Sequence, residues 1–266
     1  MIEKYINEIK EKGIVRVDNF LNKDETIKIS EIIKYYSSPK GDPKSYFPTN
    51  LMSLYSKLLS LNFPKFFHSF KILNLNKKKQ LKKFANKFFG EESLLAFIDA
   101  YYSKASNQAI LQWHTDQAYS GEKNIIKFNN PKNFYLKIFI YLTDVNHDNG
   151  CMSYIPGSHK IGFIIRKSIF EKKINYQPYW SIKDFKKIIL DNKKNFINNF
   201  NINEEIEKFL EKVKDLEFIN SSDIYSYEAK AGTAVIFDEG GIHRGSKPKF
   251  NDRMVLRYMY SRKKQD

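Results

Sequence analysis

Apolar residues recur at helical spacing in the first third of the chain and at alternating positions in most of the remainder. Helices are predicted over residues 1–12, 23–37, 51–60 and 77–89, a strand over residues 14–21, and a loop over residues 39–48. Gly13 and Gly90 end two of these helices, and Asn22 can cap another. The α-rich part, residues 1–92, is therefore expected to pack outside a sheet.

Strand patterns dominate after residue 92. They cover residues 94–102, 110–116, 134–143, 151–155, 233–237 and 253–260, and Gly-rich turns such as Asn149-Gly150 separate several of them. Many short strands joined in this way are typical of a jelly roll. We expect a mainly β fold with flanking helices (α+β), built on a double-stranded β-helix, the cupin-like jelly roll.

One segment, residues 165–215, interrupts the strand pattern. Ser181 with Asp184 resembles a capping box, and Asn203 can cap a second helix with an apolar stripe. We interpret this segment as a helical insertion into a β core formed by residues 93–164 and 216–262. It could be a lid over the site, or a packing or dimer element. The whole chain, residues 1–266, is expected to form one domain.

The composition limits the class of protein. With 266 residues and 42% hydrophobic content, the chain can bury one large core. No apolar run reaches the roughly 18 residues of a membrane span, and the N-terminus lacks the apolar core of a signal peptide. The single cysteine, Cys151, excludes an intrachain disulfide and a thiolate zinc cluster. These features favour a cytoplasmic protein.

The net charge of +15 admits two interpretations. It could attract an anionic substrate, a nucleic acid or a membrane surface. Alternatively, it reflects a composition that is also rich in Asn, Ile, Phe and Tyr, and the scattered lysines favour this second interpretation. A nucleic-acid partner would require a basic patch formed in space.

The candidate chemistry lies in two histidines, one aspartate and one arginine. His114 and Asp116 are two positions apart in a predicted strand, so they would point to the same side. His243, after a Gly-Gly turn, can complete a set of two imidazoles and one carboxylate. Such a set leaves positions on Fe(II) open for an organic co-substrate and O2. Arg253 offers a planar fork for a carboxylate, which indicates a 2-oxo acid.

The other three histidines are poorer candidates for ligands. His147 lies in a polar turn where solvation is expected, and His68 lies in an aromatic stretch that favours packing or the surface. His159 closes Pro156-Gly157-Ser158-His159-Lys160, a turn that lacks the pattern of a phosphate loop.

Several motifs resemble the phytanoyl-CoA dioxygenase family, which includes phytanoyl-CoA hydroxylase and ectoine hydroxylase. In the family's order they are residues 113–116, residues 142–152 with 155–160, and residues 232–237 followed by His243 and Arg253. Residues 13–21 also resemble the family's opening strand. The resemblance covers most of the chain except about 165–215. It implies an enzyme, an Fe(II)- and 2-oxoglutarate-dependent dioxygenase that uses O2.

The resemblance also implies roles for single residues. His114, Asp116 and His243 would hold the iron and be the catalytic set, while Arg253 would bind the distal carboxylate of 2-oxoglutarate. Phe139 would line the co-substrate pocket. From their residue types, Ser246 and Tyr102 could donate hydrogen bonds to the 2-oxo acid, and ordinary packing is the alternative for these two residues and for Phe139. Arg257, on the same strand face as Arg253, is the second choice for the carboxylate.

The predicted reaction is hydroxylation of an aliphatic C–H bond in a small or lipid-like molecule. The basic balance, with Lys104 and Lys137 near the mouth, favours an acidic group on that molecule. Asp116 favours hydroxylation over halogenation, because related iron halogenases carry a small residue at that position. Two alternatives are a non-catalytic binding module that retains the fold, and a nucleic-acid-directed oxygenase. The fold and motifs do not choose the substrate.

Overall fold

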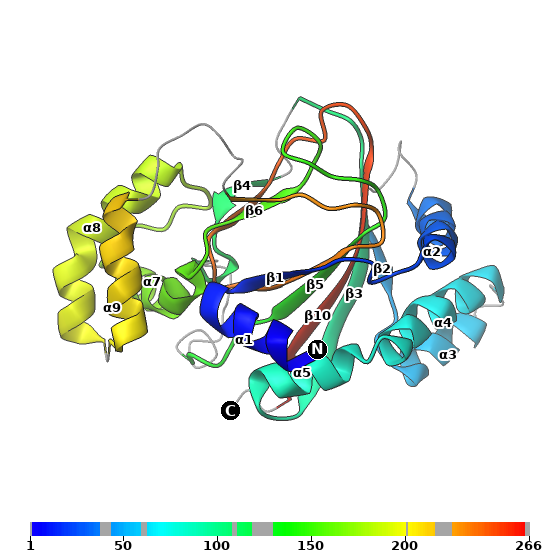
Figure 1. The fold of residues 1–266 in the computed structure, drawn as a ribbon. Helices are drawn as coiled ribbons and strands as arrows, with labels where there is room; N and C mark the ends of the chain where they lie inside the picture. Colours follow the sequence, from blue (N-terminus) through cyan, green and yellow to red (C-terminus); the bar gives the residue numbers. More distant parts are fainter. Residues whose placement is uncertain are drawn as a thin grey trace.

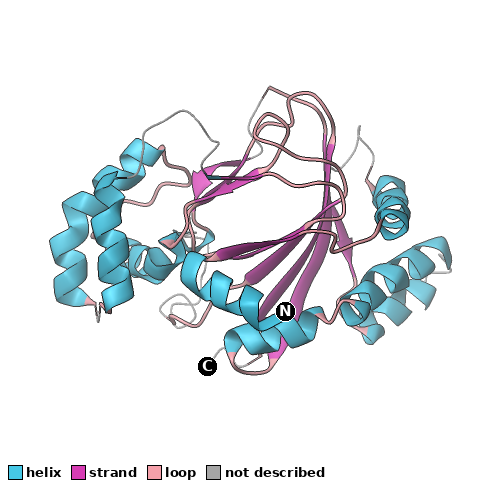
Figure 2. Ribbon diagram, in the orientation of Figure 1, coloured by secondary structure: helices cyan, strands magenta, loops and turns pink. Residues whose placement is uncertain are grey.

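Two antiparallel sheets form the centre of the protein, as seen in a computed structural model that describes residues 2–37, 44–59, 63–107, 111–118, 130–200, 202–215 and 225–263 (Figures 1 and 2). The larger sheet has the order β1 (Ile14–Val17), β8 (Ala234–Asp238), β5 (Leu136–Tyr141), β10 (Arg253–Arg262), β3 (Ser93–Ser103) and β2 (Lys44–Phe47). The smaller sheet has the order β4 (Leu111–His114), β9 (His243–Gly245), β6 (Met152–Tyr154) and β7 (Ser226–Tyr227).

Helices cover the outer face of the larger sheet. They are α1 (Ile2–Lys12), α2 (Lys23–Tyr36), α3 (Leu51–Leu59), α4 (Phe63–Lys78) and α5 (Leu81–Phe89). Their apolar side chains form one cluster with alternate residues of the strands, such as Ile138 on β5 and Leu256 on β10. The Tyr258 hydroxyl of β10 donates to the carbonyl of Ile72 on α4 at 2.7 Å. Burial of this face fixes the strand register, because a one-residue slip would expose it.

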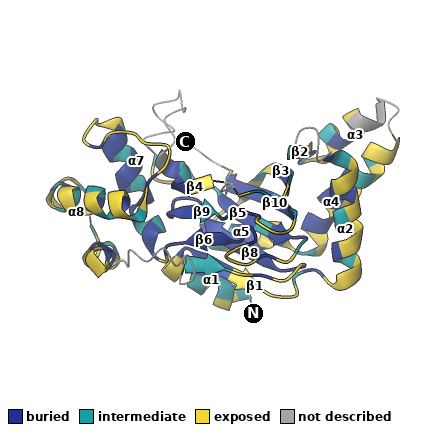
Figure 3. Ribbon diagram, turned by 90° about the horizontal axis from the view of Figure 1, so that it is seen from above, coloured by how far each residue is buried: buried dark blue, intermediate teal, exposed yellow. Residues whose placement is uncertain are grey.

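The opposite face of the larger sheet turns toward the smaller sheet. A second apolar cluster joins Tyr141, Val235 and Phe237 of the larger sheet to Met152 and Tyr154 of the smaller one. The buried residues in Figure 3 accordingly concentrate in the strands, and the exposed residues lie on the outer helices. The space between the sheets is therefore the place where a ligand site can form.

The segment from residue 162 to 215 is mostly helical, with α7 (Gly162–Phe170), α8 (Ile182–Asn199) and α9 (Glu204–Lys212). Both predicted caps are present: Ser181 and Asp184 form a capping box on α8, and the Asn203 side chain accepts from Ile206 N on α9. A third apolar cluster packs these helices against Trp113 of β4, which also forms a backbone bridge with Trp180. This packing fixes the backbone beside His114.

The structure confirms the predicted fold class, a mixture of antiparallel sheets and helices, but it changes several elements. Residues 44–47, predicted as loop, form the edge strand β2, which pairs with β3. The predicted helix over 77–89 begins only at Leu81, because Gln80 has a left-handed backbone with φ 53°. Strands β7 and β9, and helix α4 apart from residues 77 and 78, lie outside the predicted elements, whereas α7 begins three residues before the predicted helical insertion. Among the described residues, no helix is long and apolar enough to cross a membrane.

Candidate metal centre and co-substrate pocket

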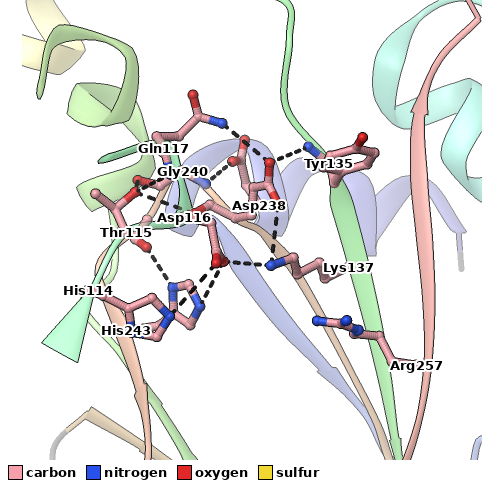
Figure 4. A network of polar contacts seen from close by, with 12 residues as sticks. His114, Thr115, Asp116, Gln117, Tyr135, Lys137, Asp238, Gly240, His243 and Arg257 are labelled. Atoms are coloured by element: carbon pink, nitrogen blue, oxygen red, sulfur yellow. Dashed lines mark hydrogen bonds and ion pairs between the residues drawn. The ribbon is translucent and has the colours of Figure 1, made fainter. Parts of the chain in front are cut away.

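The three predicted ligands come together between the sheets (Figure 4). His114, the last residue of β4, pairs directly with His243, the first residue of β9, and their ring centroids lie 4.3 Å apart. Asp116 completes the group: its Oδ2 is 3.2 Å from His243 Nε2, and its Oδ1 is 3.9 Å from His114 Nε2. One ligand atom from each residue lies within 4.8 Å of the others, so one metal ion could contact all three.

Asp116 reaches this position from a turn, which corrects the local structure predicted for it. The strand β4 ends at His114, and Asp116 begins a short 3₁₀ helix over Asp116–Ala118. The hydroxyl of Thr115 accepts from Gln117 N at 3.2 Å and donates to the carbonyl of Gly240 at 2.8 Å. These contacts bend the chain after His114 and return the Asp116 carboxylate to the imidazoles.

The Gly-Gly turn before His243 is required by close packing. A Cβ atom at Gly241 would collide with the hydroxyl end of the Tyr154 side chain, which is buried and donates to the carbonyl of Asp238 at 2.9 Å. Because only glycine avoids this collision, the turn can bring β9 against β4 and align its first residue with His114.

Both imidazoles are oriented for metal binding. His114 Nδ1 lies 2.7 Å from the carbonyl of Gln112, and His243 Nδ1 lies 2.8 Å from the carbonyl of Gly241. A carbonyl can only accept, so each Nδ1 carries the proton and each Nε2 presents a lone pair to Asp116. Burial and the neighbouring His243 lower the pKa of His114 to about 4, which keeps that ring neutral near pH 7. These donors fit a divalent iron ion.

A buried lysine holds the carboxylate of the group. Lys137 on β5 donates to Asp116 Oδ2 at 2.6 Å, and it lies 3.3 Å from Glu239 Oε2. Enclosure favours the neutral carboxyl of Asp116, but the Lys137 ammonium outweighs it and holds the pKa well below its usual range. Tyr135 N donates to Glu239 Oε1 at 2.9 Å, so the second carboxylate is also fixed. The sequence suggested that Lys137 is a cation at the mouth that could attract an acidic substrate. In the structure its ammonium group is buried and paired with two carboxylates.

A cavity of about 90 Å³ lies beside the three ligands and opens to solvent. Its wall comes from both sheets and holds Tyr101, Leu111, His114, Asp116, Lys137, Phe139, Met152, His243, Arg244, Gly245, Arg253 and Arg257. Four of these residues are cationic and one is acidic. Two of these cations, Lys137 and Arg257, are paired with carboxylates, so Arg244 and Arg253 supply the remaining positive charge next to an apolar wall.

Cations and aromatic rings alternate along one side of this pocket. The Arg257 guanidinium lies 5.9 Å from the Phe139 ring and 5.1 Å from the Tyr101 ring, and Lys44 Nζ lies 5.2 Å from Tyr101. Asp99 joins the two cations, because it accepts from Arg257 Nε at 2.8 Å and from Nη2 at 2.6 Å, and it lies 3.2 Å from Lys44. The series is stiff, since each cation contacts two rings and a buried carboxylate.

Arg253 and Arg257 line the same pocket but differ in their partners. Both carboxylate oxygens of Asp99 are used by Arg257. Arg253 is 4% exposed, stacks over Tyr141 with its Cζ 5.5 Å from the ring centroid, and has a buried Nε without a hydrogen-bond partner. Gly150 makes room for it, because a Cβ there would strike Arg253 Cδ. Arg253 is therefore the arginine with capacity for a further anion.

The remaining predicted residues fall into two groups. Phe139 lies in the pocket wall, as expected. Tyr102 does not: its hydroxyl donates to Asp252 at 2.9 Å, and its neighbour Tyr101 lines the pocket instead, because successive strand residues face opposite sides. Ser246 lies 3.9 Å from Cys151 Sγ and lines a separate surface pocket.

The other histidines stay away from the centre, as predicted. His147 is exposed and pairs with Asp148 and Glu228. His159 Nε2 contacts the carbonyl of Lys10 and the ring packs against Gly13, so its role is structural. His68 packs on α4 beside Tyr35 and Tyr36.

Comparison with known proteins places this geometry in a family. The model of the phytanoyl-CoA dioxygenase family (PhyH) matches residues 9–249, whereas no curated protein matches the chain. EctD from S. alaskensis in its apoform shares the fold, with a TM-score of 0.57 and 12% identity over 97% of this chain and 76% of that one.

Two ligand-bound structures are also similar in fold. The epimerase SnoN, solved in complex with Fe3+, alpha ketoglutarate and nogalamycin RO, gives a TM-score of 0.55 and 13% identity over 98% of this chain and 83% of that one. HygX from Streptomyces hygroscopicus, with nickel and 2-oxoglutarate bound, gives a TM-score of 0.52 and 11% identity over 98% of this chain and 86% of that one. These neighbours confirm the jelly-roll core. The chain belongs to the phytanoyl-CoA dioxygenase family of Fe(II)- and 2-oxoglutarate-dependent oxygenases.

Proposed function

We propose that His114, Asp116 and His243 hold Fe(II) in this protein, and that the reaction is hydroxylation of an aliphatic C–H bond in a small or lipid-like, acidic molecule. The observation that carries the proposal is the converging set of two Nε2 lone pairs and one ionised carboxylate in a pocket between the sheets. Three protein ligands on one side of a six-coordinate metal leave room for a co-substrate and O2.

Arg253 is the proposed partner of the distal carboxylate of 2-oxoglutarate. Its guanidinium lies in the wall of the pocket that holds the three ligands, and its Nε lacks a partner. A buried arginine binds a carboxylate through two parallel hydrogen bonds. Phe139 and Tyr101 would supply the apolar wall of the same chamber.

The protein's own groups prepare this chamber for oxidation. Bound iron, together with 2-oxoglutarate and O2, supplies an oxidant that can attack an unactivated C–H bond. Lys137 holds the Asp116 carboxylate in one orientation, and the carbonyls of Gln112 and Gly241 hold both imidazoles. The apolar wall keeps water from the reacting C–H bond.

The substrate class follows from the pocket wall. Lys137 and Arg257 are paired with buried carboxylates and Arg253 is assigned to the co-substrate, so Arg244 is the cation of the wall that supports an anionic group on the substrate. Leu111, Met152, Phe139 and Tyr101 supply apolar surface, which supports an aliphatic or lipid-like body.

The metal assignment is tested by anaerobic titration with Fe(II) and 2-oxoglutarate, which should produce a weak visible charge-transfer band. His243→Ala should abolish this band, while His147→Ala, which removes an exposed histidine outside the pocket, should keep it. An unchanged band and stoichiometry in His243→Ala would refute the ligand set.

The reaction is tested by succinate release with carboxylates, acyl-CoAs, phosphonates and amino acids, followed by mass spectrometry. The expected product gains one oxygen atom. The product must be identified, because similar folds include an epimerase, SnoN, and a carbocyclase, SnoK. Turnover confined to neutral or cationic compounds would refute the acidic substrate, and a product without added oxygen would refute hydroxylation.

A further inference from the structure

The helices α3 and α4 expose large apolar side chains to the outside of the molecule. On α4, Phe63, Phe67 and Phe70 are 52%, 57% and 44% exposed. Their spacing of four and three residues puts them on one side of the helix. On α3, Leu51, Met52 and Tyr55 are exposed as well, with Met52 at 85%. We name these six side chains the hairpin patch.

The exposure is not a sign of a poorly packed hairpin. Leu54 of α3 and Ile72, Leu73 and Leu75 of α4 are buried in the main core. The two helices therefore already have an inner apolar face, and the hairpin patch is a second one that is exposed to solvent. The Tyr55 ring of α3 lies 6.3 Å from the Phe66 ring of α4, which in turn lies 5.6 Å from Phe67, so the exposed side chains of the two helices adjoin. Exposed apolar surface of this kind marks a contact surface for a protein or a membrane.

Charge in this region has one sign. Residues 43–90 contain ten lysines and no aspartate, glutamate or arginine. This segment therefore contributes +10 to the net charge of the whole chain, which is +15. Lys78 and Lys79 pair with Glu25, and Lys44 pairs with Asp99, so not all of this charge is free. Lys71 and Lys77 are exposed on α4 itself, close in sequence to the exposed phenylalanines. The hairpin patch is thus an apolar surface bordered by cations.

From this combination, we propose that the α3–α4 hairpin docks on the surface of an anionic lipid bilayer. Phenylalanine, leucine and methionine can enter the boundary between headgroups and acyl chains, while lysine side chains reach the anionic headgroups. A second copy of this chain is disfavoured as the occupant, because it would place one lysine-rich face against another. A nucleic acid would satisfy the lysines but would offer no apolar phase to Leu51 and Met52.

The test is co-sedimentation of the whole protein with vesicles of phosphatidylcholine, alone or with about 30% phosphatidylglycerol. The wild-type protein should partition onto the anionic vesicles at least about tenfold more strongly, and about 0.5 M NaCl should weaken this binding. The triple variant Phe63→Ser, Phe67→Ser, Phe70→Ser should lose it. Circular dichroism of this variant verifies that the exposed substitutions leave the fold intact.

A matched control removes exposed apolar residues elsewhere, through Leu190→Ser and Ile197→Ser on α8 and Phe250→Ser in the loop before β10. This control should bind anionic vesicles as the wild type does. A second pair, Lys71→Gln with Lys77→Gln, keeps the fold and every apolar side chain of the patch, and should reduce binding to anionic vesicles.

Three results would overturn the proposal. The first is the absence of wild-type binding to anionic vesicles, and the second is equal binding by the wild type and the triple phenylalanine variant. The third is a wild-type dimer in light scattering that the same substitutions convert to a monomer, because the patch would then be a self-association surface.

Discussion

At the scale of single residues, two arginines four positions apart on β10 show how the surroundings decide a role. Arg257 is neutralised by Asp99 through two hydrogen bonds of 2.8 and 2.6 Å. Arg253 lies over the Tyr141 ring, has no ion pair with an acid among the described residues, and keeps an Nε without a hydrogen-bond partner. An incoming carboxylate can therefore bind Arg253 without displacing another acid.

This difference predicts the effect of removing each arginine. Arg253→Ala should raise the 2-oxoglutarate concentration needed for half-maximal activity by a large factor, because a buried charge pair contributes about 2–5 kcal/mol when one partner is truncated. Arg257→Ala should change this concentration less, and mainly destabilise the protein, since it leaves Asp99 buried with Lys44 alone. Succinate release at varied 2-oxoglutarate provides the measurement. The opposite ranking would show that Arg257 holds the co-substrate.

The sequence could predict the three ligands and Arg253 because their types, order and spacing suffice to indicate the chemistry. It could not predict the contacts that orient them. Lys137 is paired with Asp116 only because β5 runs beside β8 and faces β4, and nothing local in the sequence states that pairing. The role of Tyr102 stays a prediction: its hydroxyl donates to Asp252 and Tyr101 lines the pocket, because adjacent residues on one strand face opposite sides.

At the scale of elements, the ends of helices are the features with the clearest local cause. Asn22 Oδ1 accepts from Glu25 N at 2.9 Å, and Glu25 Oε2 accepts from Asn22 N at 3.1 Å, which is a complete capping box on α2. The same Glu25 pairs with Lys78 and Lys79 at the end of α4. This box therefore sets the start of α2 and also ties two covering helices together.

Replacing this cap has a predictable cost. Asn22→Ala should lower the free energy of unfolding by about 1 kcal/mol, because the Glu25 N–H loses its acceptor. Asn22→Ser restores an acceptor and should recover most of the loss. Urea unfolding measures both variants, and the activity of the folded protein should stay unchanged, since α2 does not line the pocket. A loss for Asn22→Ala as small as that for Asn22→Ser would contradict the role of the cap.

Elements without such local signals were harder to predict. The helix α4 carries aromatic residues on its outer side and aliphatic residues on its inner side, so it has no clean apolar stripe, and the sequence interpretation placed no helix over residues 63–76. The strand β2 has four residues and is recognisable only through its pairing with β3. Asp116 was expected on a strand, but the Thr115 hydroxyl ends the strand by binding Gly240, which is distant in sequence.

At the scale of the whole molecule, the site depends on strands that are far apart in the chain. His114 and His243 are direct neighbours across β4 and β9, although they are 129 positions apart in the chain (243 − 114). Composition and motif order indicated a jelly roll, but the arrangement that brings β5, β8 and β10 under the smaller sheet is a tertiary property. The same arrangement buries acidic groups, which couples the stability of the fold to pH.

Asp238 at the end of β8 is such a group. It is 8% exposed, and its Oδ1 accepts from Gly240 N at 2.7 Å. Burial raises the pKa of Asp238 to about 7 from 3.8, and the neighbouring Glu239 acts in the same direction. The folded protein therefore holds this proton more tightly than the unfolded chain does. The resulting stability is complete below pH 3.8 and is lost as the pH rises through 7, a loss on the order of 4 kcal/mol in total.

Asp238→Asn should remove this dependence, because an amide can still accept from Gly240 N and never ionises. Relative to the wild type, the metal-free variant should gain about 2–3 kcal/mol in free energy of unfolding between pH 5 and pH 8, measured with urea. Asp144→Asn is the matched control: Lys230 lowers the pKa of this exposed carboxylate, which is ionised in both states across that range. Its difference from the wild type should stay constant. The prediction is contradicted if the difference in free energy of unfolding between Asp238→Asn and the wild type is also constant between pH 5 and pH 8. Asp238 would then be ionised in the folded protein at both pH values, and a cation would have to offset its burial.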